Sequence, residues 1–531
     1  MAAVHAGALE VPRFCVFERE FVQTAKGGNP YTDVEATATF TDPSGKSRSI
    51  PLFWDGGATW RVRFSPDVEG RWTWSTKSAD VGLTQGGEFV CVASKLHGAI
   101  RAMKDAPHHF EYQDGTPYFP VGDTFWLAMA KEPAEKLDRA AVFHYVDLRA
   151  KQGFNWVQSA VLRAGGNEGG EPFGELAKET LRPEYFQECD ARVKYMNERG
   201  ITMMLFLMWG GQNPVTWNKF PSDEACLRFA RYATARYAAY NVAFCASGEW
   251  NKWYEKNIDA KRDPKDDVRD LMLRIGKQIA AADPHGRMVA LHVGSGIAYT
   301  REFAPEAWMS FGDFQQNYWN LHQEILNGWK HNKPLVNAEY AYFLRDQDGD
   351  GKVDKNNSAT IDDIRHATWD VAMAGGYAIT GFGTTYNGGH RDPGPFDPDA
   401  AKDKPCEQQF PLVRTILGSV DWWKLTSADE LVTAKEPRGQ DVMADPNKRT
   451  ESDYVRPPLT MYWCLAEAGK IYVVYARGVK DCVELRAPEG AYKVTRFDPR
   501  TGERTAAADA TGPVVKLTVP DGQDWVWVVR K

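Results

Sequence analysis

The chain has 531 residues, of which 43% are hydrophobic and 25% are charged, as in a folded globular protein. This composition excludes a disordered chain, a collagen-like repeat or a coiled coil as the main architecture. The 64 basic and 71 acidic residues give a net charge of −7. Nucleic acid is therefore not expected as a partner, because its binding requires a basic face.

Tryptophan is the most unusual feature of the composition, with 19 residues in a chain that is 12% aromatic. Core packing accounts for some of these rings, and aromatic rings also stack on flat apolar ligand faces such as those of sugars. No segment reaches the roughly 20 apolar residues of a membrane span, so no span is expected. No feature of the sequence points to an oligomeric state.

Residues 1–100 are expected to form an N-terminal β-sandwich. Polar and apolar residues alternate over short segments, for example in Val34–Phe40, and the segments are separated by turns rich in aspartate and glycine. Short strands about ten residues apart are typical of a small sandwich. The other expected strands are Phe14–Phe21, Thr59–Phe64 and Gly70–Ser75.

Residues 101–432 alternate apolar runs with helical patterns and predict a (β/α)8 TIM barrel. Several runs are apolar throughout, which indicates strands buried on both faces, as in a parallel sheet. The expected strands are Tyr118–Trp126, Phe154–Val161, Ile201–Trp209, Asn241–Glu249, Met288–Val293, Ser310–Gln315, Pro334–Tyr340 and Tyr377–Phe382. The expected helices are Asp138–Gln152, Glu184–Arg199, Asp223–Tyr240, Val268–Ala282 and Ile361–Ala374.

Residues 433–531 return to short strands with glycine or aspartate turns and predict a C-terminal β-sandwich. The fold class is thus α/β, with a barrel flanked by two small sandwiches. The expected strands are Thr460–Cys464, Lys470–Tyr475, Asp481–Leu485, Ala491–Asp498, Val514–Val519 and Trp525–Val529.

Two glutamates close expected barrel strands. Glu249 ends strand four, and Glu339 ends strand seven after an apolar run. Reactive groups of barrels sit at the carboxyl ends of strands, and paired carboxylates are what glycoside cleavage requires. A separation of about 5–5.5 Å gives retention of configuration, and a wider one gives inversion. We expect Glu249 and Glu339 to be catalytic, with an inverting enzyme or a non-catalytic carbohydrate-binding protein as alternatives.

Other polar and aromatic residues at the expected strand ends are candidates for binding substrate. Asp123 has a structural alternative near a helix start, and His292 has one as a histidine satisfied inside the barrel. Tyr318 is a candidate to hydrogen-bond the nucleophile, and tryptophans are candidates to shape sugar subsites. The remaining candidates are Trp126, Trp209, Trp250, Asn251, Asn317 and Tyr386.

The loop from Asp346 to Asp354 matches a calcium-binding pattern, with oxygen ligands at positions one, three, five and nine and a glycine at six. Position seven would ligate through its backbone carbonyl. Position twelve is Asn357 instead of the bidentate glutamate, so the classical EF-hand pattern is broken, and another residue or water would complete the ligand shell. We expect a structural calcium ion, with a solvated acidic loop as the alternative. No cofactor for catalysis is expected, since no phosphate-binding glycine loop or CxxC pair is present. The predicted metal ligands are Asp346, Asp348, Asp350, Lys352 and Asp354.

Four segments carry a resemblance to apiosidase-like glycoside hydrolases of the large clan of retaining (β/α)8 glycosidases: YFPVGDTFW, ASGEW, PLVNAEYAY and GGYAITGFGTTYN. The first 100 residues resemble a domain of unknown function that precedes such barrels. The C-terminal region resembles a small sandwich of the collagen-binding type that follows them. The clan's pattern implies that Glu249 is the acid/base and Glu339 the nucleophile. The clan usually has asparagine before the acid/base, where this chain has Gly248, so Asn251 or Asn155 is a candidate for contacting the sugar 2-hydroxyl.

The resemblance implies a retaining glycoside hydrolase that acts on a plant, algal or microbial polysaccharide or its oligosaccharides. The expected partner is thus a carbohydrate substrate. Similar enzymes are usually exported, so a periplasmic or extracellular location is expected. Met1–Glu10 shows no signal-peptide pattern, so the signal peptide is expected to be absent from this chain.

Overall fold

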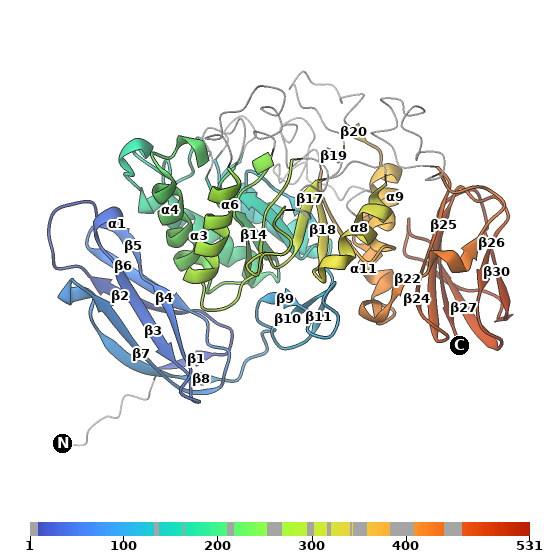
Figure 1. Ribbon diagram of the computed structural model, residues 1–531, viewed down its shortest axis with the longest axis horizontal. Helices are drawn as coiled ribbons and strands as arrows, with labels where there is room; N and C mark the ends of the chain where they lie inside the picture. Colours follow the sequence, from blue (N-terminus) through green and yellow to red (C-terminus); the bar gives the residue numbers. More distant parts are fainter. Residues whose placement is uncertain are drawn as a thin grey trace.

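The computed structural model shows a central barrel with a β-sandwich on either side of it (Figure 1). None of the described helices is long and apolar enough to span a membrane. The structure describes residues 9–131, 137–162, 165–209, 217–251, 268–294, 302–315, 320–339, 342–343, 358–382, 408–439 and 459–531.

Eight parallel strands form the barrel in the order β16-β15-β14-β13-β12-β21-β18-β17. His292 and Asp313 form a bridge pair that joins the two ends of this order, so the barrel is nearly closed. The predicted α/β barrel with flanking sandwiches is therefore confirmed. The strands are β12 (Gly122–Thr124), β13 (Trp156–Ala160), β14 (Thr202–Phe206), β15 (Val242–Cys245), β16 (Val289–Ala290), β17 (Gly312–Gln315), β18 (Leu335–Glu339) and β21 (Tyr377–Phe382).

Helices lie between most of these strands, and several begin at side-chain caps. The side chains of Asp138, Ser222 and Thr360 each accept a hydrogen bond from a backbone N–H of the first turn. These N–H groups have no carbonyl partner within the helix, so the caps stabilise the helix starts. All five expected helices are present, and α8 and α11 are two additional ones. The barrel helices are α2 (Arg139–Lys151), α3 (Pro183–Glu198), α4 (Asp223–Tyr237), α6 (Arg269–Ala282), α8 (Leu321–Gly328), α9 (Ile361–Ala372) and α11 (Leu412–Leu417).

The expected strand Tyr118–Trp126 divides in the structure. Its first part is β11 (Pro117–Tyr118), which joins β9 (Ile100–Ala102) and β10 (Phe110–Tyr112) in a small sheet below the barrel strands (Figure 1). Phe110 packs against Trp156 and Phe311, so this sheet covers the amino-terminal end of the barrel. Two further short strands, β19 (Tyr342–Phe343) and β20 (Ser358–Ala359), pair beside β21.

The N-terminal sandwich has two sheets, in the orders β1-β8-β7-β3-β4 and β2-β6-β5, around a core of its own. Buried ion pairs attach it to the barrel: Arg236 of α4 meets Asp55 at 2.8 Å, and Arg63 meets Asp190 of α3 at 2.7 Å. The elements are β1 (Glu10–Pro12), β2 (Phe17–Val22), α1 (Pro30–Asp33), β3 (Ala36–Thr41), β4 (Ser47–Pro51), β5 (Phe53–Gly56), β6 (Thr59–Phe64), β7 (Gly70–Ser78) and β8 (Gly86–Val92).

The C-terminal sandwich also has two sheets, β22-β24-β25-β31-β27-β28 with β29 beside β27, and β23-β26-β30. Asp370 of α9 pairs with Arg477 at 2.7 Å, and Arg365 of α9 pairs with Asp524 at 2.8 Å. β22 (Thr426–Ser427) and β23 (Val432–Thr433) join these sheets from the end of the range expected for the barrel. The other strands are β24 (Met461–Glu467), β25 (Ile471–Arg477), β26 (Cys482–Arg486), β27 (Ala491–Phe497), β28 (Arg504–Ala506), β29 (Ala510–Thr511), β30 (Val514–Thr518) and β31 (Trp525–Arg530).

Candidate active site

Glu339 is the last residue of β18, at the carboxyl end of the barrel. The register between β17 and β18 shifts just before it, so that Gln315 pairs with Glu339 and Ala338 is an extra residue. A bulge of this kind bends the strand and re-aims a side chain. Nε2 of Gln158 on β13 donates to the carbonyl oxygen of Ala338 at 2.8 Å, and this bond fixes the bulge. Because β13 and β18 are not neighbours in the sheet, Gln158 reaches Ala338 through the barrel interior.

A row of three titratable side chains crosses the ends of β16, β17 and β18. Nδ1 of His292 lies 2.7 Å from Oδ1 of Asp313, and Nε2 lies 3.4 Å from Oε2 of Glu339. The side chains of His292 and Asp313 are completely buried, whereas Glu339 keeps 10% of its side chain exposed. Glu339 is therefore the member of this row that can meet a substrate.

The charges of this row are strongly coupled. Burial by itself would lower the pKa of His292, but the carboxylates of Asp313 and Glu339 outweigh it and raise that pKa to about 10. Burial raises the pKa of Asp313, and the charge of Glu339 adds to this, while His292 opposes both. The imidazole of His292 therefore keeps its second proton at neutral pH and is the positively charged group of the row.

Aromatic rings surround the imidazole of His292. The ring centroids of Phe206, Trp126 and Trp209 lie 5.4, 6.1 and 6.1 Å from that of His292. Trp126 also meets Trp209 edge-to-face at 4.9 Å. Trp126 is buried, and Trp209 is only half-buried. The structure thus brings Trp126, Trp209, His292 and Glu339 together, with Trp209 nearest to solvent.

Glu249 follows β15 and has a backbone φ of +45°, in the left-handed region. This conformation costs a residue other than glycine about 1–2 kcal/mol, and such strain gathers at functional sites. Gly248 before it forms a bridge pair with Trp209. A Cβ on Gly248 would lie 2.4–2.8 Å from ring carbons of Trp209, so asparagine does not fit there unless the indole moves. The indole therefore occupies the space that the clan's asparagine would need.

Asn155 lies at the opposite end of the barrel from the two glutamates. It precedes β13, where its Nδ2 donates to the carbonyl oxygen of Phe119 and its Oδ1 accepts from the N–H of Val121. Both side-chain groups are thus used to bind the backbone beneath the barrel. The expectation that Asn155 contacts substrate is therefore corrected: Asn155 holds a turn at the amino-terminal end.

Trp250 and Asn251, which follow Glu249, are only 1% exposed. The ring of Trp250 packs edge-to-face on Phe303 at 5.2 Å, and Oδ1 of Asn251 accepts a 2.6 Å hydrogen bond from the N–H of Gly294. The expectation that they contact a sugar stays a prediction. Asn251 ties the segment after β15 to the segment after β16.

Asp123 is completely buried and pairs with Nε of Arg149 on α2 at 2.7 Å. The ion pair lies between strand β12 of the barrel and helix α2. Asp123 therefore has the structural role that was the alternative to substrate binding. The structure therefore corrects its assignment to substrate binding.

Eight predicted site residues lie outside the described part of the chain. In the described ranges, no group of three or more histidine, cysteine, aspartate or glutamate side chains is arranged to hold a metal ion. The residues outside these ranges are Asn317, Tyr318, Tyr386, Asp346, Asp348, Asp350, Lys352 and Asp354.

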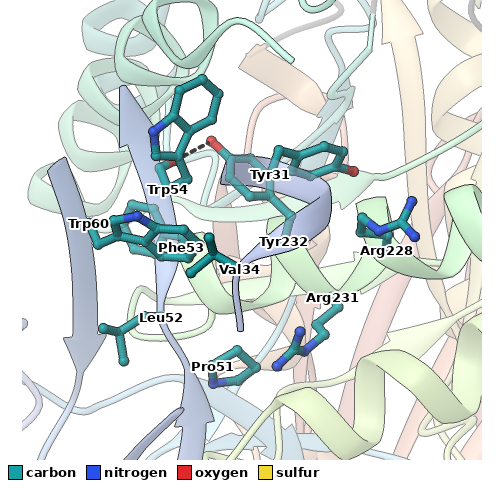
Figure 2. Close-up of a pocket in the computed structure, with 10 residues that line it drawn as sticks. All are labelled: Tyr31, Val34, Pro51, Leu52, Phe53, Trp54, Trp60, Arg228, Arg231 and Tyr232. Carbon is teal, nitrogen blue, oxygen red and sulfur yellow. Dashed lines mark hydrogen bonds between the residues drawn. The ribbon is translucent and has the colours of Figure 1, made fainter. Parts of the chain in front are cut away.

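A separate small pocket lies between the N-terminal sandwich and α4 (Figure 2). Its volume is about 30 Å³, which is room for about two water molecules and not for a sugar ring. The hydroxyl of Tyr232 donates to the carbonyl oxygen of Trp54 at 3.3 Å across it (Figure 2). We interpret this pocket as a packing gap between domains.

Sequence reasoning missed Asp313 and Gln158. Each is a polar residue inside an apolar strand: Asp313 lies between Phe311 and Phe314, and Gln158 follows Trp156 and Val157. Burying a charge or an amide is costly without partners, so a polar residue within an apolar run is a usable signal. Neither residue ends its predicted strand, so position at a strand end does not mark either of them.

Residues 104–391, more than half of the chain, match the model of the apiosidase-like catalytic domain. The chain belongs to the apiosidase-like family. This family member is a glycoside hydrolase, and its residues 10–79 match a separate domain of unknown function, DUF5060. Both matches agree with the resemblance found in the sequence.

Solved structures support the fold of this apiosidase-like chain. A Bacteroides vulgatus protein assigned as a glycoside hydrolase has a TM-score of 0.71 and 19% identity, over 98% of this chain and 99% of its own. A family 5 glycoside hydrolase from the same organism has a TM-score of 0.61 and 15% identity, over 82% of this chain and 93% of its own. None of the curated proteins matches the chain significantly.

Proposed function

We propose that this apiosidase-like protein is a retaining glycoside hydrolase that acts by double displacement, with Glu339 as nucleophile and Glu249 as acid/base. The observation that carries the proposal is the position of Glu339: a partly exposed carboxylate at the bulged end of β18, beside a buried cation. Glu249 supports it, because its strained backbone lies at the same end of the barrel.

In the first step a carboxylate oxygen of Glu339 attacks the anomeric carbon. The bond from that carbon to the leaving oxygen breaks, and Glu249 gives its proton to this oxygen. In the second step Glu249 takes a proton from water, the water oxygen bonds to the anomeric carbon, and the bond to Glu339 breaks. Two inversions at one carbon give net retention of configuration.

The test is hydrolysis of a panel of aryl glycosides and of plant, algal and microbial polysaccharides. We expect Glu249→Gln and Glu339→Gln each to lower turnover at least about 10³-fold, because each removes a few kcal/mol of barrier reduction. Glu489→Gln, at an exposed position of the C-terminal sandwich, is the control for the same change of residue type. Near-normal activity of either active-site variant on a substrate with a poor leaving group would contradict the assignment.

The anomer of the first product separates this proposal from its two alternatives. Retention observed by NMR supports double displacement, and inversion assigns the same glutamates to a single displacement through water. Binding of an oligosaccharide without hydrolysis, by wild type and variants alike, would favour a non-catalytic carbohydrate-binding protein.

We also propose a structural calcium ion in the loop Asp346–Asp354, on the pattern of its sequence. Removal of calcium with a chelator should lower the melting temperature, and added Ca²⁺ should restore it. Asp348→Ala should abolish this response. An equal response of this variant and the wild type would contradict the site.

A periplasmic or extracellular location is proposed on the resemblance to exported enzymes. Cell fractionation of the native host with an antibody to this chain tests it, and recovery of the protein in the cytosol alone would contradict it.

A further inference from the structure

At the carboxyl end of the barrel, His292 lies between the carboxyl groups of Asp313 and Glu339. We propose that His292, oriented by Asp313, is a positioning residue that holds the Glu339 carboxylate ionised and aimed for attack. This inference rests on the proposed function, since it assumes that Glu339 is the nucleophile. His292 itself is completely buried, so it acts through Glu339 and not by touching substrate.

The two ring nitrogens of His292 determine its charge. Its Nδ1 lies 2.7 Å from Oδ1 of Asp313, a distance that requires a proton between the two atoms. A neutral ring with its proton on Nδ1 would direct the lone pair of Nε2 at Oε2 of Glu339, 3.4 Å away. The contact with Glu339 is attractive only when Nε2 also carries a proton. A carboxyl oxygen beside each ring nitrogen is the arrangement that favours an imidazolium ring, which can donate from both.

The surroundings of His292 strengthen this charge pairing. Trp126, Phe206 and Trp209 surround the ring and keep water from competing with it. Charges interact more strongly where water is excluded. The arrangement therefore favours an ionised Glu339 at the rim of an otherwise aromatic wall.

Three titratable groups face His292 from the neighbouring strands. They are the carboxyl groups of Asp313 on β17 and Glu339 on β18, and the thiol of Cys245 on β15. Burial raises the pKa of the Cys245 thiol well above its usual value, so the thiol is neutral. The two carboxyl groups raise the pKa of His292 to about 10 against the effect of burial, which agrees with the geometry.

Oδ2 of Asp313 is a further sign that this row is built for function. It is buried and has no hydrogen-bond partner among the described residues. An unsatisfied buried acceptor costs about 1–3 kcal/mol. We attribute this cost to the charge that Asp313 supplies to His292.

The kinetic test is the dependence of kcat/KM on pH for His292→Gln. Glutamine keeps a donor but carries no charge. A nearby cation stabilises an ionised carboxyl group by about 1–3 pH units, so we expect the acidic limb of the profile to move to higher pH by about that amount. We expect kcat to fall more than KM rises. A uniform fall in rate with an unchanged profile would show a merely structural role and overturn the inference.

A second variant, Asp313→Asn, keeps the shape of the row and removes the charge that supports the cation. We expect the alkaline limb of its profile to move to lower pH. The matched control is His322→Gln, because His322 is also a buried histidine 2.7 Å from a carboxylate, Asp429, but lies outside the site. It should change stability and leave both limbs in place. An Asp313→Asn profile that matches the control would overturn the role of Asp313.

Nitrogen-15 NMR of labelled histidine tests the charge of the ring without any substrate. The His292 signal is assigned by its absence from His292→Gln. A ring protonated on both nitrogens at pH 8 supports the inference, and a neutral ring at pH 8 overturns it, whether or not the panel contains a substrate. Absence of hydrolysis by the wild type, by contrast, counts against the proposed function and leaves the result for the ring intact.

Discussion

Two regions of the molecule bury a histidine against an aspartate, and they differ in how completely the aspartate is bonded. At the interface between the barrel and the C-terminal sandwich, Asp429 accepts from Nε2 of His322, from Oγ of Ser427 and from the backbone N–H of Cys464. At the end of the barrel, Asp313 accepts from His292, and its second oxygen has no partner within the described residues.

The balance of charge also differs between these regions. At the interface the other buried carboxylates meet guanidinium groups: Asp370 faces Arg477 and Asp524 faces Arg365. At the barrel end a single imidazole faces two carboxyl groups, Asp313 and Glu339. Matched pairs with all atoms bonded hold two domains together. A row in which two carboxyl groups share one cation costs stability. Active sites use such arrangements to fix the protonation state of a reacting group.

Breaking the interface should give the largest loss of stability. Asp370 binds both Arg477 nitrogens and also accepts from Nε1 of Trp463. Asp370→Ala removes the carboxylate that binds the buried Arg477 guanidinium, and we expect the free energy of unfolding to fall by about 3–5 kcal/mol. Urea denaturation measures this. Asp370→Asn, which keeps the shape and one acceptor, should lose less, and equal stability of Asp370→Ala and wild type would refute the interpretation of the interface.

The row at the barrel end should make stability depend on pH in the alkaline range. The pKa of His292 is raised to about 10 in the folded protein, from its usual 6.5, so the folded state binds the extra proton. Its contribution is complete below about pH 6.5 and is lost as the pH rises through about 10. The difference in unfolding free energy between wild type and His292→Gln should therefore shrink over this range. A constant difference from pH 6 to 10 would argue against the raised value.

The close contact of Gly248 with Trp209 predicts an intermediate effect. Alanine at 248 would press on the indole ring, and overpacking of this kind costs about 1–3 kcal/mol. Because Trp209 also lies beside His292, we expect Gly248→Ala to lower activity as well as stability. Gly522→Ala is the control, since no atom lies within 4 Å of a Cβ added at Gly522. Indistinguishable variants would mean that Trp209 is free to move.

The strained backbone of Glu249 predicts the smallest effect, and one of opposite sign. Glycine adopts a φ of +45° without strain, so Glu249→Gly should be about 1 kcal/mol more stable than wild type while losing activity. Glu249→Gln keeps the strained backbone and is the reference variant for this comparison. Thermal melts of the two variants distinguish these outcomes, and a destabilised Glu249→Gly would show that the side chain contributes packing that outweighs the strain.

Much of the fold could be predicted because its signals are local. Apolar runs such as Ile201–Trp209 and helical patterns such as Val268–Ala282 reveal strands and helices whatever surrounds them, and β14 and α6 lie within these ranges. The position of Glu339 at a strand end follows in the same way, whereas β15 ends at Cys245 and Glu249 lies in the segment after it. Helix α8 was missed because it has only eight residues, so its pattern is short.

The partners of the site residues could not be predicted, because strands distant in sequence bring them together. The sequence marks His292, but only the closure of the barrel places it against Asp313, 21 residues later, and Glu339 beyond that. The sequence likewise does not tell which end of a strand Asn155 occupies in space, or that Trp250 points into the core. Period and composition determined the barrel and the strand-end position of Glu339. Tertiary packing alone decided which buried charge faces which, because that choice depends on contacts between strands and not on the order of residues within them.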